Sequence, residues 1–142
     1  MPRMIFISLP VTDLPRSMAF YEALGFTKNP QFTGETAACM VWSEAIQVVL
    51  LTHETWKSFT TRPIPPSTSS EVGLALTFES RAAVDAAHDA AAANGGTPDI
   101  NPIEDDAFGY GRDFTDPDGH VWGAKWMAPA MAEAGVLEGA RS

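Results

Sequence analysis

Residues 112–126 read R-D-F-T-D-P-D-G-H-V-W-G-A-K-W and predict a β-hairpin. The turn falls at D-P-D-G, residues 116–119, where proline presets φ and glycine turns without steric cost. In the strand after the turn, both tryptophans point to one face, whereas Gly123 and Lys125 point to the other. The tryptophan face of this strand therefore suits packing in the core, whereas the role of the face with Gly123 and Lys125 needs a separate explanation.

The residues before this hairpin show a strand and then a helix. Residues 72–78 alternate large apolar with small side chains, which predicts a strand. Ser80 then caps a helix that carries an apolar stripe and ends at N-G-G, residues 94–96. Further strands are expected at about 97–103, 108–116 and 120–127. The order of elements in this half of the chain is β-α-β-β-β.

The first half of the chain repeats that order. Residues 4–11 alternate as a strand, Asp13 is a suitable N-cap, and the helix that follows ends at Gly25. Three more strands are expected at about 26–33, 36–43 and 46–52. The stretch Y-E-A-L-G-F at 21–26 precedes A-A-A-N-G-G at 91–96 by 70 residues, which indicates an internal structural duplication.

The chain is interpreted as a single domain, residues 1–142, built from two half-modules. Residues 53–70 contain three prolines and a Ser/Thr tail, so they predict an exposed linker with some local structure near Trp56 and Phe59. The expected half-modules are about 4–52 and 71–127, and a C-terminal helix is expected at about 129–138.

Composition limits where the protein works. The chain has 45% hydrophobic residues, no apolar run near the roughly 18 residues of a membrane span, and no recognisable secretion signal. Its single cysteine, Cys39, cannot form an intrachain disulfide and is expected to be an inert core thiol. We therefore expect a globular cytoplasmic protein without a membrane partner.

The charge distribution argues against a polyanionic partner. The net charge of −9 opposes binding of nucleic acid, which depends on Lys and Arg at the phosphates. Seven of the eighteen acids lie between Asp99 and Asp118, with only Arg112 against them. They form either a solvated face or a field that attracts a cationic ligand.

Two motifs resemble a known superfamily. The stretch V-T-D-L-P-R-S-M-A-F-Y-E-A-L-G-F at 11–26 and the hairpin D-P-D-G-H-V-W at 116–122, together with the duplication, resemble the vicinal oxygen chelate superfamily. It includes glyoxalase I, the extradiol dioxygenases and the bleomycin-resistance proteins. Over about residues 4–127 the resemblance implies an α+β fold, with cupped mixed sheets around a cavity, helices on the convex side and often a dimer.

In metal-dependent members, the resemblance implies inward His or Glu ligands on the first and fourth strands of each half. The matching positions in this chain are Phe6, Leu50, Gly73 and Gly123. None offers a donor side chain, so no metal site and no cofactor are predicted there. These residues either line a ligand cavity or fill a closed core. A displaced metal site at His53 or His120, with Glu54 or the acids at 104–106, is a weaker alternative to ordinary solvated or hydrogen-bonded histidines.

Cations and aromatic residues supply further candidates. Tyr110 and Arg112 share a face of their strand, beside two glycines that leave room for a ligand. Arg112 either fixes a ligand carboxylate or carbonyl or pairs with a neighbouring acid, and Lys125 is either a cavity cation or extends to its rim. Candidates for stacking on a flat ligand are Trp42, Trp56 and Trp122, the last by parity better suited to packing beneath a helix.

We therefore expect a homodimer that binds a small organic molecule without the usual metal site, as resistance proteins do by sequestration. The expected ligand-binding residues are Phe6, Leu50, Gly73, Tyr110, Arg112, Gly123 and Lys125. One alternative is a metal-dependent lyase, isomerase or dioxygenase of the glyoxalase type. Another is a degenerate domain kept for dimerisation.

Overall fold

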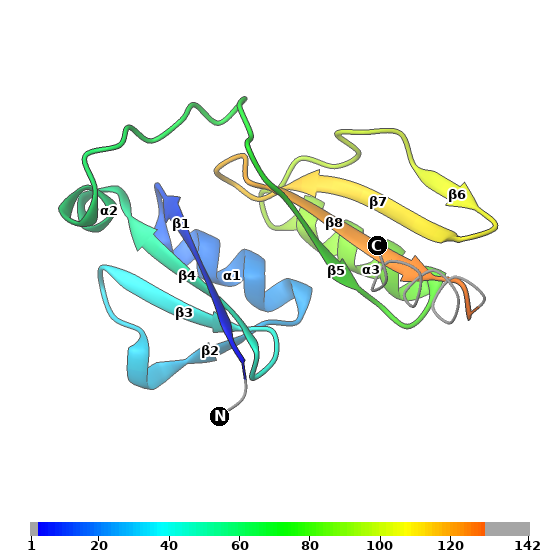
Figure 1. Cartoon of the computed structure of the whole chain (residues 1–142), viewed down its shortest axis with the longest axis horizontal. Helices are drawn as coiled ribbons and strands as arrows, with labels where there is room; N and C mark the ends of the chain where they lie inside the picture. Colours follow the sequence, from blue (N-terminus) through cyan, green and yellow to red (C-terminus); the bar gives the residue numbers. More distant parts are fainter. Residues whose placement is uncertain (1–2, 130–142) are drawn as a thin grey trace.

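A computed structural model describes residues 3–129 and shows two modules with the same architecture (Figure 1). The first module consists of β1 (Ile5–Val11), α1 (Leu14–Leu24), β2 (Thr27–Asn29), the short 3-10 helix η1 (Pro30–Phe32), β3 (Ala37–Val41) and β4 (Ile46–Thr52). The second consists of β5 (Gly73–Thr77), α3 (Arg81–Ala93), β6 (Glu104–Asp106), β7 (Gly109–Thr115) and β8 (Val121–Met127). Between them lies α2 (His53–Phe59), followed by the linker 60–72.

Each module contains one four-stranded mixed sheet. The strand orders are β1-β4-β3-β2 and β5-β8-β7-β6, so that the two sheets repeat one topology. β1 runs parallel to β4 and β5 parallel to β8, whereas the other neighbours are antiparallel. This confirms the α+β fold and the duplicated β-α-β-β-β order.

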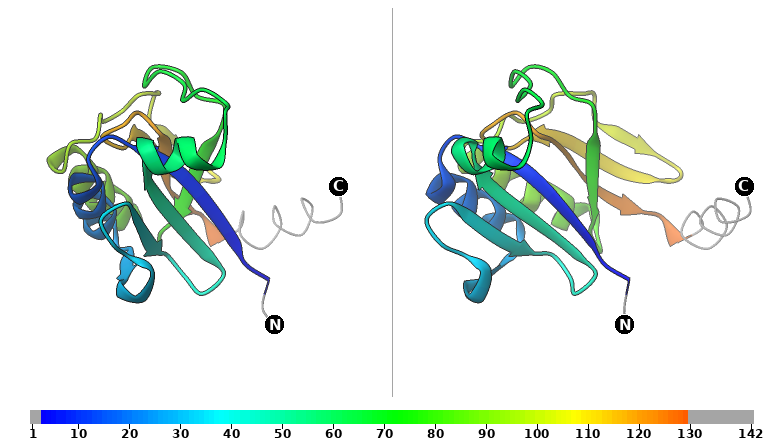
Figure 2. Two further views of the ribbon diagram at one scale, coloured as in Figure 1. Left: turned by 90° about the vertical axis from the view of Figure 1, so that its left-hand side faces the viewer. Right: turned by 60° about the vertical axis from the view of Figure 1, so that its left-hand side comes forward.

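Both long helices cover the same side of the molecule, and the opposite faces of the two sheets are open (Figures 1 and 2). The helix ends follow from capping. The Asp13 side chain accepts a hydrogen bond from the Arg16 backbone N–H at 3.1 Å, and Gly25 ends α1 with a φ of 114°. The Ser80 hydroxyl accepts from the Ala83 N–H at 3.0 Å at the start of α3.

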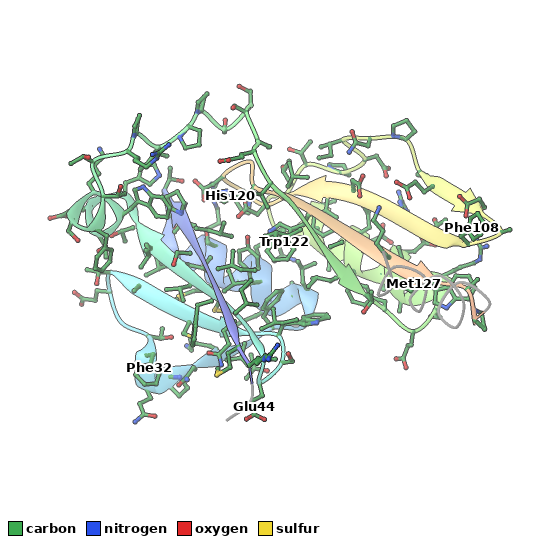
Figure 3. The ribbon with its side chains drawn as sticks, in the orientation of Figure 1. Phe32, Glu44, Phe108, His120, Trp122 and Met127 are labelled. Carbon is green, nitrogen blue, oxygen red and sulfur yellow. The ribbon has the colours of Figure 1, made fainter. Side chains whose placement is uncertain are left out.

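The core lies between the helices and the sheets, and aromatic residues join the modules. The ring centroids of Phe20 on α1 and Phe114 on β7 are 6.2 Å apart, and those of Tyr21 and Trp122 are 5.7 Å apart. In Figure 3, Trp122 lies at the junction of the two modules. All four side chains are at most 2% exposed. The expectation that Trp122 packs beneath a helix is confirmed.

Several expected boundaries were wrong. Residues 97–103 form no strand beyond a single bridge between Thr97 and Thr115, because prolines at 98 and 102 lack donors and Asp99 has a φ of 46°. The strand expected at 26–33 ends at Asn29, whose side chain accepts from the Gln31 N–H and starts η1. The segment expected as a linker from residue 53 begins with α2. The helix expected at about 129–138 lies outside the described residues apart from Pro129.

Candidate functional site

The open face of the first sheet is set by alternation along β1. Ile7 and Leu9 pack against the core, so Phe6 and Ser8 point to the open side. In the parallel register, Ser8 lies beside Val49 of β4. The side chains that face the open side on β4 are therefore those at 47, 49 and 51.

A groove of about 440 Å³ lies on this open face, between the sheet and α2. Its lining residues are Ser8, Val49, Leu51, Trp56, Phe59 and Thr60. The groove is lined by the sheet on one side and by two aromatic residues of α2 on the other. No charged side chain is among these described lining residues, so the groove suits an apolar surface.

Local sequence explains why α2 forms beside the groove. The Thr52 hydroxyl accepts a hydrogen bond from the Thr55 N–H at 3.2 Å and caps the helix. The Thr52 and Thr55 hydroxyls also bond to each other at 2.9 Å. No side chain of α2 is fully buried, and Phe59 is 74% exposed. The helix therefore packs lightly on β4 and β1.

The indole N–H of Trp56 has no hydrogen-bond partner. Among the described residues, Trp56 Nε1 is the buried side-chain nitrogen or oxygen that lacks one. An indole N–H can only donate, and leaving such a donor unsatisfied in the interior costs about 1–3 kcal/mol. Since buried polar groups are nearly always satisfied, this atom requires an explanation.

Phe6 and Leu50, the two predicted site residues of the first module, do not line this groove. Phe6 is 58% exposed on the open face, two residues before Ser8, and does not line the groove. Leu50 is fully buried in the core on the helix side, so its expected place on the cavity face is wrong. The open-face residues of β4 beside the groove are its neighbours Val49 and Leu51.

The open face of the second sheet carries small residues and one ion pair. Gly73 is exposed on β5, and Gly123 is buried on β8. Lys125 Nζ lies 2.9 Å from Asp113 Oδ1. The lysine side chain passes close over Gly123, where an added Cβ would come within 2.9 Å of Lys125 Cε. Burial opposes ionisation of Asp113, but hydrogen bonds from Asn101 and Lys125 lower its pKa below the ordinary value. Lys125 is therefore on the open face, as expected, and is held by acids.

Tyr110 and Arg112 do share a face, but it is the face covered by α3. The Tyr110 hydroxyl donates to Asp85 on α3 at 2.7 Å. Arg112 binds Asp99 with Nη2–Oδ2 at 2.8 Å and Asp85 with Nη1–Oδ1 at 3.1 Å. Hydrogen bonds from Tyr110 and Arg112 lower the pKa of Asp85, and the bond from Arg112 lowers that of Asp99. Their expected place beside a cavity is wrong, and the ion-pair interpretation of Arg112 is the one observed.

The hairpin turn ties the second module to the first. Asp118 Oδ1 accepts from the backbone N–H and the hydroxyl of Thr12, at 3.0 and 2.8 Å. Buried Asp116 accepts from the Tyr21 hydroxyl at 2.6 Å, and that hydroxyl in turn accepts from Trp122 Nε1 at 2.9 Å. Burial raises the pKa of Asp116. Several of the clustered acids therefore bind partners within the fold.

His53 and His120 line one small pocket of about 150 Å³, below the linker. His120 Nε2 lies 2.8 Å from the carbonyl oxygen of Pro10, which can only accept, so this nitrogen carries the proton. In residues 3–129, no three His, Cys, Asp or Glu side chains gather as a metal site would require. The same part of the chain contains no helix long and apolar enough to cross a membrane.

The residues at the expected ligand positions do not fit a divalent metal. Phe6, Gly73 and Gly123 bring no donor atom, and the open face of β4 presents an amide and two hydrocarbon side chains, at 47, 49 and 51. Divalent ions require several converging nitrogen, oxygen or sulfur donors. The residues at these positions therefore do not form a ligand set for such an ion.

Sequence reasoning missed part of the groove. Trp56 was singled out as a stacking candidate, and local structure was expected near Phe59. The sequence does not identify Val49 and Leu51, because β4 is apolar on both faces and its pattern does not distinguish the two sides. The alternation of residues 4–11 does place Ser8 on the face of Phe6, although Ser8 is not among the expected ligand-binding residues.

Comparisons with known proteins agree with this architecture. A family model described as Glyoxalase/Bleomycin resistance protein/Dioxygenase superfamily matches residues 3–123. The structure resembles a glyoxalase-related enzyme from Fulvimarina pelagi (20% identity, TM-score 0.74, covering 89% of this chain and 88% of that one). It also resembles a glyoxalase/bleomycin resistance protein from Albidiferax ferrireducens (26%, 0.64, 87% and 97%) and TnmS3, an antibiotic binding protein from Streptomyces sp. CB03234 (22%, 0.61, 90% and 98%). No curated protein matches the chain significantly.

Proposed function

Because the chain belongs to the glyoxalase/bleomycin resistance protein/dioxygenase superfamily, we propose that it binds a small organic molecule in the groove between α2 and the first sheet. Binding is non-covalent and does not use the metal positions of the superfamily. The concrete form is sequestration of a toxic compound, and a relative with this fold, TnmS3, is named as an antibiotic binding protein.

The observation that carries this proposal is the apolar groove with its aromatic wall. Trp56 and Phe59 offer large apolar surfaces that a flat molecule would cover. Removing apolar surface from water contributes roughly 25 cal/mol per Å², so a ligand that buries on the order of 200 Å² gains about 5 kcal/mol before the cost of association. Phe59 is 74% exposed beside this hollow, so its ring is accessible to a ligand.

The proposal includes a homodimer. β1 and β5 each lie at the edge of a sheet, and each has one edge that pairs with no described strand. Beside the edge of β1 lie the exposed side chains of Met4, Ile5 and Phe6, at 42%, 54% and 58%. An apolar strip along an unpaired edge is a surface that a second copy can cover. We place the protein in the cytoplasm, where its unpaired Cys39 would stay reduced.

A neutral fluorescent probe tests the groove. N-phenyl-1-naphthylamine becomes brighter in apolar surroundings, so we expect it to bind the protein with saturable enhancement. Ser8→Trp fills the groove from the exposed side of β1 and abolishes the enhancement. Ala75→Trp is the matched control, because Ala75 is exposed on the open face of the edge strand β5 in the other module.

The outcomes separate the alternatives. Loss of enhancement in Ser8→Trp alone supports the groove. Equal enhancement in both variants, or none in the unmodified protein, would overturn the proposal. Thermal denaturation of each variant shows whether the substitution has left the fold intact.

A further inference from the structure

The indole N–H of Trp56 differs from that of Trp122, the tryptophan that is buried in the core. Trp122 Nε1 donates to the Tyr21 hydroxyl at 2.9 Å, whereas Trp56 Nε1 is equally sealed and donates to nothing. Both nitrogens are donors only, and an interior donor is normally paired. The difference lies in position, because Trp56 borders the groove and Trp122 lies in the core.

No described acceptor lies within hydrogen-bond distance of this donor. Thr52 and Thr55 bond to each other and cap the helix, and the Ser58 hydroxyl donates to the Thr55 carbonyl at 2.6 Å. Among the groove residues, Val49, Leu51 and Phe59 carry hydrocarbon side chains, and the hydroxyl groups of Ser8 and Thr60 do not bond to Trp56. A molecule that occupies the groove can therefore supply the partner that Trp56 Nε1 lacks.

The light packing of α2 lets such a partner reach the nitrogen. No α2 side chain is fully buried, and the helix packs mainly on β4 and β1. Because Trp56 Nε1 is buried beside the groove, a flat molecule has to shift the indole in order to reach its N–H. An acceptor at the edge of that molecule would then meet the donor.

We propose that the groove selects a neutral, flat aromatic molecule with a hydrogen-bond acceptor at its edge, and that Trp56 Nε1 donates to that acceptor. This inference rests on the proposed binding function and specifies its ligand class. The ligand is neutral because no described lining residue is charged, and it is flat because it lies between a sheet and two aromatic rings. Trp56 thus determines specificity through one hydrogen bond.

Quinoline and naphthalene form a matched pair of probes for this hydrogen bond. They have nearly the same shape, quinoline is neutral at pH 7.5, and only quinoline has a ring nitrogen that accepts. Dissociation constants come from displacement of N-phenyl-1-naphthylamine by each compound. Trp56→Phe removes the N–H and keeps an aromatic ring, and Trp126→Phe is the control, because Trp126 stacks with Arg81 in the other module.

The measured quantity is the preference for quinoline over naphthalene. We expect this ratio to fall by about fivefold in Trp56→Phe, as the loss of one net hydrogen bond would cause, and to stay unchanged in Trp126→Phe. In ¹H–¹⁵N spectra, the indole peak that Trp56→Phe removes should move downfield with quinoline and not with naphthalene.

The failures are distinguishable. If both compounds displace the probe but the ratio is the same in all three proteins and the peak does not move, the donor role is wrong while the groove still binds. If the unmodified protein binds neither the fluorescent probe nor the two compounds, the binding function itself is wrong and this inference falls with it.

Discussion

Removing the hydroxyl group of Tyr21 should destabilise the protein more than its size suggests. This oxygen donates to Asp116 Oδ2 at 2.6 Å and accepts from Trp122 Nε1 at 2.9 Å, and all three residues are at most 2% exposed. Tyr21→Phe leaves a buried carboxylate oxygen and a buried indole N–H unsatisfied. Each costs about 1–3 kcal/mol, so we expect the free energy of unfolding to fall by about 3 kcal/mol.

Tyr110→Phe is the matched control, since it deletes the same atom at a more exposed place. The Tyr110 hydroxyl donates to Asp85, whose side chain is 47% exposed and keeps its bond to Arg112. Water can replace the lost partner, so we expect a loss of at most about 1 kcal/mol. Urea denaturation at pH 7.5, followed by tryptophan fluorescence, gives both values. If the two variants lose the same free energy, the buried network does not stabilise the module junction as we argue.

Two further predictions concern single residues. Gly119 has a φ of 90° and lies against the Ser67 carbonyl, so Gly119→Ala should lower the unfolding free energy by about 2 kcal/mol. Gly34 has open space around it, so Gly34→Ala should have almost no effect in the same urea titration. Similar urea midpoints would contradict the linker contact. Burial, and after it repulsion from Arg112, lowers the pKa of His88, whose Nε2 accepts a hydrogen bond from the Asp99 backbone N–H. Below about pH 6.5 the unfolded chain therefore binds a proton that the folded protein does not. The free energy of unfolding should be at its full value above that pH and should fall as the solution becomes more acidic. In His88→Gln this loss between pH 7 and 5 should be smaller, and an unchanged pH dependence would refute the assignment.

Local signals in the sequence predicted the framework of the fold. Asp13, Ser80 and Gly25 cap helices where expected, because capping depends on a few adjacent residues. The D-P-D-G turn joins β7 to β8 as predicted. The strand expected at 97–103 does not form, because the two prolines in this segment lack N–H donors.

The candidate site was less predictable, because it depends on which face of each strand a helix covers. Leu50 lies in a strand with apolar residues on both faces, so only packing against the core decides its direction. Tyr110 and Arg112 alternate with glycines, and the sequence does not reveal that α3 supplies Asp85 to both of them. The unpaired N–H of Trp56 depends on how α2 packs over the sheet, and a local sequence pattern does not reveal this packing.

The hairpin contacts with the first module also bear on how the chain folds during synthesis. Thr12 meets Asp118 across 106 residues, so α1 leaves the ribosome long before its buried partners exist. Until they are made, α1 can pack on its own sheet, but the Tyr21 hydroxyl lacks both of its hydrogen-bond partners. The aromatic side chains of Phe20 and Tyr21 should therefore stay partly uncovered on the ribosome until Phe114 and Trp122 arrive, which exposes them to chaperones and to aggregation for much of translation.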